Sequence, residues 1–242
     1  MSWNYYPLNS TQDERSREIA QIVSMLIFIS IVLVFQMTLT FLNINYLLIL
    51  ILSLGLIFGS NVNIFLFGIE EKSQFYYDRP FIHPWFLQIL NMFQPEPLTT
   101  DVYVNVAGGL VPIAVASILA VLHPTIIIPA ILLSLFLIII INRLAIITNY
   151  GVVMPVIIVP ILGLLGGAGI GILYILIGIP IVLTNIAMIA YLSVTISILI
   201  GADLLNLGKL HKIRSNGLSI GGAGIFDGIF LSGLLTLIFI LF

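Results

Sequence analysis

The sequence predicts an all-α polytopic membrane protein with about seven transmembrane helices, some of them kinked or broken. Composition gives the first reason: of 242 residues, 60% are hydrophobic and only 7% are charged. A soluble domain carries about 25% charged residues, so this chain cannot coat a soluble globule with charge. The second reason is that the apolar residues form continuous runs of about 20 residues, the length of a membrane-crossing helix, rather than the short alternating segments of a membrane β-barrel.

Each apolar run is interpreted as one span, and together the spans make residues 1–242 a single transmembrane domain. The first run is too long for a cleavable signal peptide, and its flank has mixed charge, so we expect it to remain as a helix. The predicted spans are 19–42, 46–67, 103–122, 125–142, 152–177, 181–207 and 218–242.

The basic residues predict how these spans are oriented. All eight Lys and Arg residues fall in segments that seven spans place on one side of the membrane: Arg15, Arg17, Lys72, Arg79, Arg143, Lys209, Lys212 and Arg214. Basic residues concentrate on the cytoplasmic side. We therefore predict a multi-pass protein of the cell membrane with a cytoplasmic N-terminal segment (1–18) and an outside C-terminus. A re-entrant span two, or a re-entrant start of span seven, would keep the same charge bias.

The longest polar connection, residues 70–101, is rich in aromatic residues and prolines. Aromatic side chains favour the headgroup zone, so we predict a loop that lies at the cytoplasmic interface. Two interpretations remain open for this loop. It is either a membrane anchor or a lid on which a substrate docks.

The composition also excludes several kinds of partner and cofactor. The net charge of −2 offers no basic face to a phosphate backbone, so we expect a lipid bilayer and no nucleic acid as partner. The chain has no cysteine, which excludes disulfides and thiolate metal sites. The three histidines, His83, His123 and His211, fall in separate connections, so we predict no metal and no cofactor.

Glycines at a spacing of four mark one face of the fifth span. Gly163, Gly167 and Gly171 lie on that face, and Gly166 and Gly169 are predicted to widen the groove. Small residues on one helix face allow a second backbone to approach closely. The alternative interpretation is flexibility for gating, helped by prolines that kink the same span.

Two acids lie inside the predicted membrane region, Asp203 near the end of span six and Asp227 early in span seven. An acid inside the bilayer costs about 2.5–3.5 kcal/mol on insertion scales, which favours a functional role. The two spans are consecutive and joined by a short link, so they should pack together. Two carboxyls that meet in a low dielectric share one proton, the arrangement with which aspartic proteases activate water.

Amides and glycines near these acids are candidates for supporting them. A buried amide needs a partner, and a glycine lets an extended substrate backbone approach. The candidate supporting residues are Asn61, Asn63, Asn105, Asn206, Gly222, Gly224 and Gly228.

Four motifs carry a family resemblance: GSNVNI at 59–64, VNVAGGLVP at 104–112, GADLLNL at 201–207 and SIGGAGIFDGIFL at 219–231. Together they resemble a prokaryotic, largely archaeal family of membrane proteins known as domain of unknown function 1614. The resemblance extends from about residue 55 to the end of the chain and implies no activity.

A weaker resemblance is to the intramembrane aspartyl proteases of the presenilin and signal-peptide-peptidase class. In that class two aspartates also lie on consecutive spans, and the second follows glycines, which implies catalytic roles for Asp203 and Asp227. The sequence departs from the class pattern at several points. Ala202 replaces the usual tyrosine, the segment from Gly222 to Asp227 is two residues longer than the usual motif, no Pro-Ala-Leu follows, and seven spans are predicted where the class has nine.

The sequence leaves three functional hypotheses. The first is an intramembrane aspartyl peptidase that cleaves transmembrane segments of other proteins with the Asp203 and Asp227 pair. The second is an ion- or proton-coupled transporter or channel in which the same acids line a polar pathway. The third is a non-catalytic membrane scaffold. The arrangement of the two acids discriminates among them, and the substrate and the oligomeric state stay open.

Overall fold

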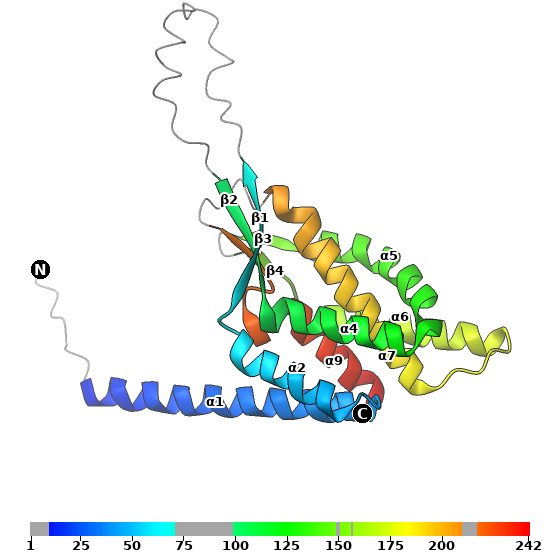
Figure 1. Ribbon diagram of the computed structural model, residues 1–242, viewed down its shortest axis with the longest axis horizontal. Helices are drawn as coiled ribbons and strands as arrows, with labels where there is room; N and C mark the ends of the chain where they lie inside the picture. The colour runs from blue at the N-terminus through cyan, green and yellow to red at the C-terminus, as the bar shows by residue number, and fades with distance from the viewer. Residues whose placement is uncertain (1–9, 71–98, 149–150, 156, 210–216) are drawn as a thin grey trace, which may run out of the picture.

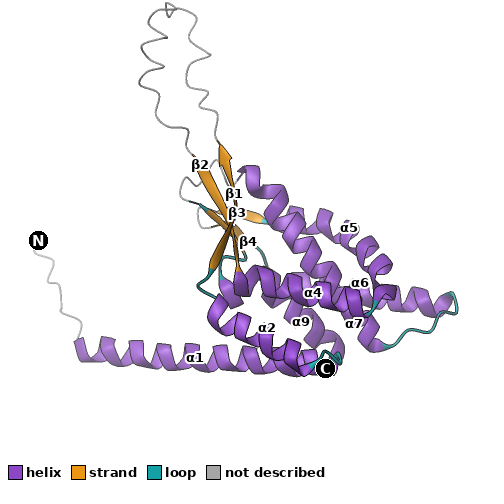
Figure 2. Ribbon diagram, in the orientation of Figure 1, coloured by secondary structure: helices purple, strands orange, loops and turns teal. Residues whose placement is uncertain are grey.

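The computed structural model of the protein describes residues 10–70, 99–148, 151–155, 157–209 and 217–242. In these ranges the chain is mostly helical, with a small sheet at one end of the helices (Figures 1 and 2). The α-helices are α1 (Ser10–Phe41), α2 (Tyr46–Gly59), α4 (Val111–Leu122), α5 (Ile127–Leu144), α6 (Ile158–Leu176), α7 (Leu183–Ile198) and α9 (Gly228–Leu241).

Within the described ranges, four helical segments are long and apolar enough to cross a membrane, which indicates a multi-pass membrane protein. They are Ser16–Phe41, Pro124–Leu144, Ile158–Leu176 and Leu183–Lys209. Three shorter apolar helices, Tyr46–Gly59, Val106–Leu122 and Gly228–Leu241, fall below the length of a full crossing. The structure therefore does not show the seven transmembrane helices that the apolar runs predict.

In the predicted spans two, three, five and seven, the helix is shorter than the predicted span, because part of each apolar run forms a β-strand instead. β1 (Asn63–Glu70) follows α2, β2 (Thr99–Asn105) precedes α4, and β5 (Leu218–Ile220) precedes α9. A short hairpin, β3 (Ile146–Thr148) and β4 (Gly151–Val153), precedes α6. Strand residues such as those of β1 are as apolar as helical ones, so a hydropathy run cannot separate the two.

The larger sheet has the order β1-β2-β5. β1 and β2 are antiparallel, with a bulge between Phe65 and Phe67, and β5 lies parallel to β2 with Tyr103 opposite Ser219. The sheet departs from the all-α prediction. The predicted loop 70–101 falls largely outside the described residues, and its described ends belong to β1 and β2.

Helix α7 is the centre of the helical part. It packs against α4, α5, α6 and α9, and its residues from Ala187 to Thr195 are buried. Two serines tie it to α5: the Ser193 hydroxyl donates to the Ala130 carbonyl at 3.0 Å and the Ser197 hydroxyl to the Ser134 carbonyl at 3.1 Å. Such hydrogen bonds satisfy polar groups in an apolar surrounding.

The glycines of α6 confirm the predicted close packing. Gly163, Gly167 and Gly171 are buried. They face α7, where an added Cβ would meet the side chains of Val194, Ala190 and Ile186 respectively.

The outer glycines of the same helix do not widen this groove. A Cβ at Gly166 would meet Leu133 of α5, and a Cβ at Gly169 would meet nothing within 4 Å. The four-residue spacing thus selects a narrow face, and the intervening glycines point elsewhere.

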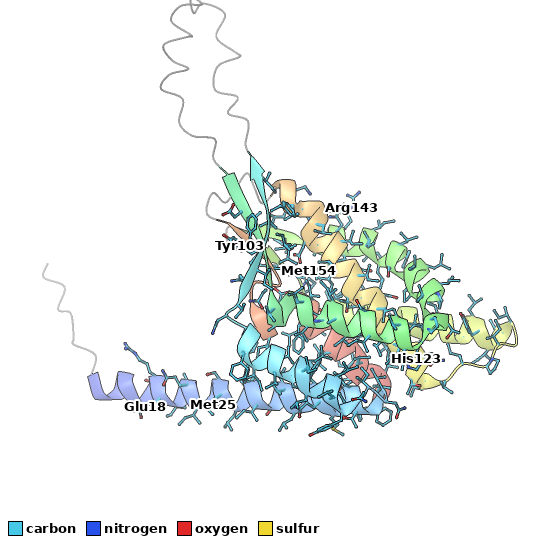
Figure 3. All side chains as sticks on the ribbon, viewed as in Figure 1. Glu18, Met25, Tyr103, His123, Arg143 and Met154 are labelled. Atoms are coloured by element: carbon cyan, nitrogen blue, oxygen red, sulfur yellow. The ribbon has the colours of Figure 1, made fainter. Side chains whose placement is uncertain are left out.

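Helix α1 differs from the others because its first half extends beyond the rest of the helices (Figures 1 and 3). Met25 is 64% exposed, whereas Phe35 and Leu39 are buried. At its far end the rings of Phe41 and Phe242 lie 5.5 Å apart, so α1 and α9 end at the same side of the molecule. α1 begins at Ser10, so residues 10–18 of the predicted N-terminal segment are helical.

Candidate functional site

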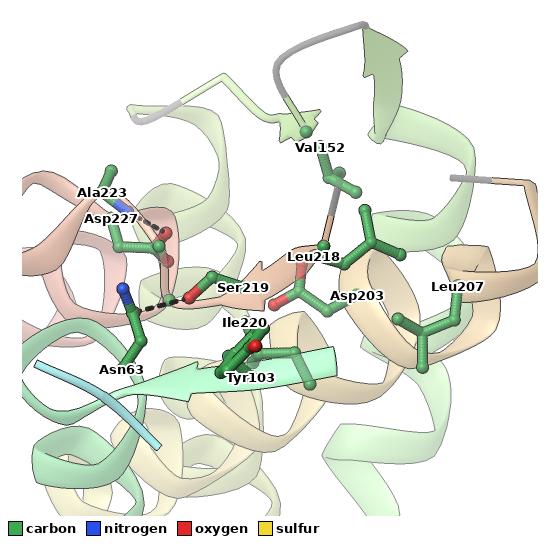
Figure 4. A pocket seen from close by; sticks show the side chains of 14 residues that line it. Asn63, Tyr103, Val152, Asp203, Leu207, Leu218, Ser219, Ile220, Ala223 and Asp227 are labelled. Atoms are coloured by element: carbon green, nitrogen blue, oxygen red, sulfur yellow. Dashed lines mark hydrogen bonds between the residues drawn. The ribbon is translucent and has the colours of Figure 1, made fainter. Parts of the chain in front are cut away.

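Asp203 and Asp227 line one cavity of about 510 Å³ (Figure 4). β5 and the turn after it, strand β4 and the segment after α7 form its walls. A second hollow of about 230 Å³ shares Asp203 and Asp227 with the first. The two acids therefore lie where the two hollows adjoin.

A π-helix places Asp203. The segment Leu199–Asp203 continues α7 with a widened turn, a feature that often occurs at functional sites. At Gly201 an added Cβ would lie 2.8 Å from the Ile138 carbonyl oxygen, so this glycine lets α5 approach the widened turn. The Asn142 amide of α5 donates to the Gly201 carbonyl at 2.8 Å and fixes the turn.

Asn206 braces the same turn from the other side. Its amide donates to the Ala202 carbonyl at 2.8 Å, and its oxygen accepts from the Lys209 ammonium at 3.0 Å. Asn206 is buried and does not line the cavity, so it supports the backbone beside Asp203. Sequence reasoning missed Asn142, because an amide in the last turns of a helix is an ordinary helix-end residue.

The carboxyl group of Asp203 is half-buried and makes no hydrogen bond within the described part of the chain. It projects from the segment after α7, and Asp227 lies beside Ala223 on the far side of β5 (Figure 4). The two acids line the same cavity from different elements. A proton or a ligand in the cavity is therefore free to reach Asp203.

Asp227 has a different environment, because it caps the N-terminus of α9. One carboxylate oxygen accepts from the Ile229 backbone N–H at 3.0 Å, and the other accepts from the Ala223 N–H at 3.4 Å. Caps of this kind satisfy the free N–H groups of a helix end, and the helix dipole favours negative charge there.

Closely packed glycines hold the turn that carries Asp227. Gly221 and Gly224 have φ of 71° and 62°, a conformation that L side chains rarely adopt. A Cβ at Gly108, in the π-helix Val106–Leu110, would collide with the carbonyl oxygens of both. It would also lie 2.9 Å from the Cβ of Asp227. Backbone thus packs on backbone directly behind the acid.

The other two predicted glycines have smaller roles. Gly222 lines the cavity, and a Cβ there would lie 2.9 Å from the Ser219 carbonyl oxygen. Gly228 begins α9 and lines the smaller hollow, where a Cβ would make ordinary contact with Met154.

Asn105 and Asn63 connect the sheet to this turn. The Asn105 amide donates to the Ser60 carbonyl at 2.8 Å and to the Asn63 side-chain oxygen at 3.2 Å, and its own oxygen accepts from the Gly108 N–H at 2.9 Å. The Ser219 hydroxyl donates to the same Asn63 oxygen at 2.8 Å (Figure 4). Asn63 lines the cavity, and Asn105 is buried behind it.

Asn61 is exposed and is not among the residues that line the cavity. Tyr103 does line it, although no sequence pattern indicates this role, because the residue begins an apolar run. The Tyr103 hydroxyl donates to the Asp101 carboxylate at 3.3 Å, and the negative charge of Asp101 raises the pKa of Tyr103.

The cavity is acidic. Among the described residues that line it, Asp203 and Asp227 are the charged ones, and no Lys or Arg joins them. In the described part of the chain no three His, Cys, Asp or Glu side chains gather as metal ligands would. Two carboxyls without a basic partner favour a shared proton or a bound cation.

Residues 57–239 match the family described as a protein of unknown function (DUF1614). The chain belongs to the DUF1614 family. The matched range contains both acids, the glycine turn and the whole three-stranded sheet. No curated protein and no solved structure matches the chain, so the weaker resemblance to the presenilin class gains no support.

Proposed function

We propose that this DUF1614 protein is an intramembrane aspartyl peptidase that cleaves transmembrane segments of other proteins. The observation that carries the proposal is that Asp203 and Asp227 line one cavity from different elements. No Lys or Arg is found among the described residues that line this cavity. In the proposed reaction the two carboxyls act as a pair and hold one proton between them. This is the state in which an acid pair can both activate water and protonate a leaving group.

The different environments of the two acids divide the work. Asp227 accepts two backbone N–H groups, which favours its ionised form over that of Asp203. Asp227 takes a proton from water while the water oxygen bonds to the substrate carbonyl carbon. Asp203 donates its proton to the amide nitrogen as the C–N bond breaks, and an amine and a carboxyl group are released.

The predicted orientation in the membrane fits this reaction. Arg143 lies near the sheet end of the helices, and His123 lies toward the other end (Figure 3). Basic residues favour the cytoplasmic side, so the sheet end, where Arg143 lies, would be cytoplasmic. α1 and α9 end together on the side away from the sheet, so the C-terminus would lie outside. The acid pair then opens toward the cytoplasm, which supplies water.

A second candidate is an ion- or proton-coupled transporter. The observation that favours it is the π-helix at Leu199–Asp203, because transporters bind ions where a membrane helix is interrupted. In that case Asp203 and Asp227 relay a proton or hold a cation, and no bond in a peptide is broken.

The test is cleavage of a panel of single-span peptides by purified protein in detergent, beside proton and cation flux in liposomes. Asp203→Asn and Asp227→Asn should each lower cleavage by about 10³-fold or more, with the double variant no worse, because the pair acts as one unit. Asp101→Asn, which removes an acid that does not line the cavity, should leave cleavage intact.

Normal cleavage by either Asn variant would refute the peptidase proposal. Flux that depends on both acids, without cleavage, would establish the transporter instead. Folded wild-type protein with neither activity would leave the non-catalytic scaffold.

A further inference from the structure

Two strand edges line the acid cavity from different sheets. β5 has β2 on one side and no described strand on the other, and β4 has β3 on one side and no described strand on the other. Gly151 and Val152 of β4 line the cavity, as do the three residues of β5 (Figure 4). An open strand edge presents unpaired N–H and C=O groups, which can accept another strand.

The backbone hydrogen bonds are consistent with open edges. Within the described chain, β5 makes one backbone hydrogen bond in addition to those with β2. In it the Gly222 N–H donates to the Ser219 carbonyl across a turn. β4 makes none beyond β3 in the same described ranges. Two carbonyls of these edges are already bonded, since the Gly151 carbonyl accepts from the Thr148 hydroxyl at 2.8 Å and the Ser219 carbonyl accepts the turn bond. In the described ranges the backbone of Val152 makes no bond beyond β3, so β4 keeps bonding capacity beside the cavity.

One glycine of the cavity, Gly151 of β4, leaves room for a second backbone, because a Cβ there would meet nothing within 4 Å. The other lining glycines, Gly217, Gly221 and Gly222, pack against the protein's own atoms. Glycine in or beside a strand often marks a place where another backbone approaches closely. The cavity volume of about 510 Å³ is far more than a bare cation needs and suits a short peptide segment.

We propose that the cavity binds an apolar peptide segment in extended conformation, as a strand added between β4 and β5 beside the acid pair. This inference rests on the proposed function only for the cleavage that follows, because binding can occur without it. A peptide that leaves its helix within a membrane must have its N–H and C=O groups satisfied by protein. The two strand edges supply those partners and hold one carbonyl next to Asp203 and Asp227.

The absence of cysteine from the sequence allows a direct test of this geometry. Val152→Cys and Ser219→Cys are made singly in a background of Asp203→Asn and Asp227→Asn, so that bound peptide stays intact. The probe is a synthetic single-span peptide of apolar residues, prepared as a set with one cysteine moved along consecutive positions. Disulfide yield is measured in detergent for each peptide against each variant.

A bound strand should give yields that alternate with a repeat of about two residues at both Val152→Cys and Ser219→Cys. Ser117→Cys, an exposed position on α4 away from the cavity, is the control and should give low yields without a repeat. Methylating alternate backbone nitrogens of the probe should lower the cavity yields at least fivefold and leave the control unchanged.

A repeat of about 3.6 residues would overturn the inference, because the peptide would then bind as a helix. Yields no higher than at Ser117→Cys would overturn it as well. Cleavage of the same peptides by wild-type protein is scored separately. Cleavage together with a helical repeat would support the peptidase proposal and reject the added strand. A two-residue repeat without cleavage would support the added strand and reject the peptidase proposal.

Discussion

Glycine serves close packing in two regions of this protein, and the two regions differ in what the glycines touch. On the α6 face, Cβ atoms at Gly163, Gly167 and Gly171 would meet side chains of α7. Behind the acids, Cβ atoms at Gly108 and Gly221 would meet backbone atoms of each other's segments. The α6 face joins two helices, whereas the turn region fixes a functional group.

The difference shows how each region can respond to change. A side chain can change rotamer, so the α6–α7 contact can adjust by small shifts. A carbonyl oxygen in a turn with positive φ has no such freedom, since moving it moves the whole turn and Asp227 with it. The turn region should therefore tolerate less added volume than the helix contact.

Gly108→Ala should have the largest effect on stability. Its methyl group would collide with the Gly221 and Gly224 carbonyls, so we expect a loss of about 3 kcal/mol, at the upper end for overpacking, together with loss of activity. Thermal unfolding in detergent measures the first effect. Gly169→Ala, in open space, is the control and should be neutral or slightly stabilising. Equal stability of the two variants would contradict backbone packing behind Asp227.

Gly167→Leu should destabilise the α6–α7 contact by about 2 kcal/mol, because the leucine would separate the two helices. Activity of the protein that stays folded should persist, since the acids are anchored elsewhere. The matched control is Gly169→Leu, which places the same side chain on the open face of the same helix. Unfolding temperatures that do not differ between the two would refute close packing at this face.

Asp227→Ala should cost about 1 kcal/mol of stability, the usual effect of losing a helix cap. Asp227→Asn should retain most of that stability, because Asn is also a good cap, and still be inactive. Asp203 has no cap to lose, so Asp203→Asn and Asp203→Ala should be similarly stable. Denaturant titration checks the four variants, and an equal loss on both alanine substitutions would reject the assigned cap.

Asp101→Asn should have the smallest effect, a lower pKa for Tyr103 with little change in stability. The negative charge of Asp101 is the main cause that raises the pKa of Tyr103, so its removal should move the pKa toward 10. Absorbance titration at alkaline pH, with Tyr103→Phe subtracted, follows this one hydroxyl. An unchanged titration after Asp101→Asn would show that the two groups do not interact.

Much of the helical part could be predicted from the sequence. Long apolar runs become membrane helices because an apolar chain in lipid must satisfy its backbone internally, and the run over 125–142 agrees closely with α5. The face of Gly163, Gly167 and Gly171 follows from helix periodicity alone. The family resemblance was carried by motifs that lie in the matched residues 57–239.

The sheet and the surroundings of the acids could not be predicted in the same way. Apolar residues such as Ile64 and Phe65 have the same hydropathy in a helix and in a strand, so hydropathy alone cannot assign their secondary structure. Asn206 and Asn105 have the same chemistry in the sequence, but one braces a π-helix and the other joins the sheet to a turn. The role of Asn105 depends on Ser60 and Asn63, which lie far away in the chain, and that of Asn206 depends on the widened turn that its near neighbours form.

The sequence by itself determined that this chain is a multi-pass membrane protein and that Asp203 and Asp227 are its unusual acids. Both conclusions depend on local composition, since the price of burying a charge in lipid is set by the residue and its neighbours. Only the tertiary structure decided that α7 widens at Leu199–Asp203, that β5 ends in a glycine turn packed on Gly108, and that these two segments form one cavity. Long-range backbone contacts decide this arrangement, and no local pattern of residues encodes them.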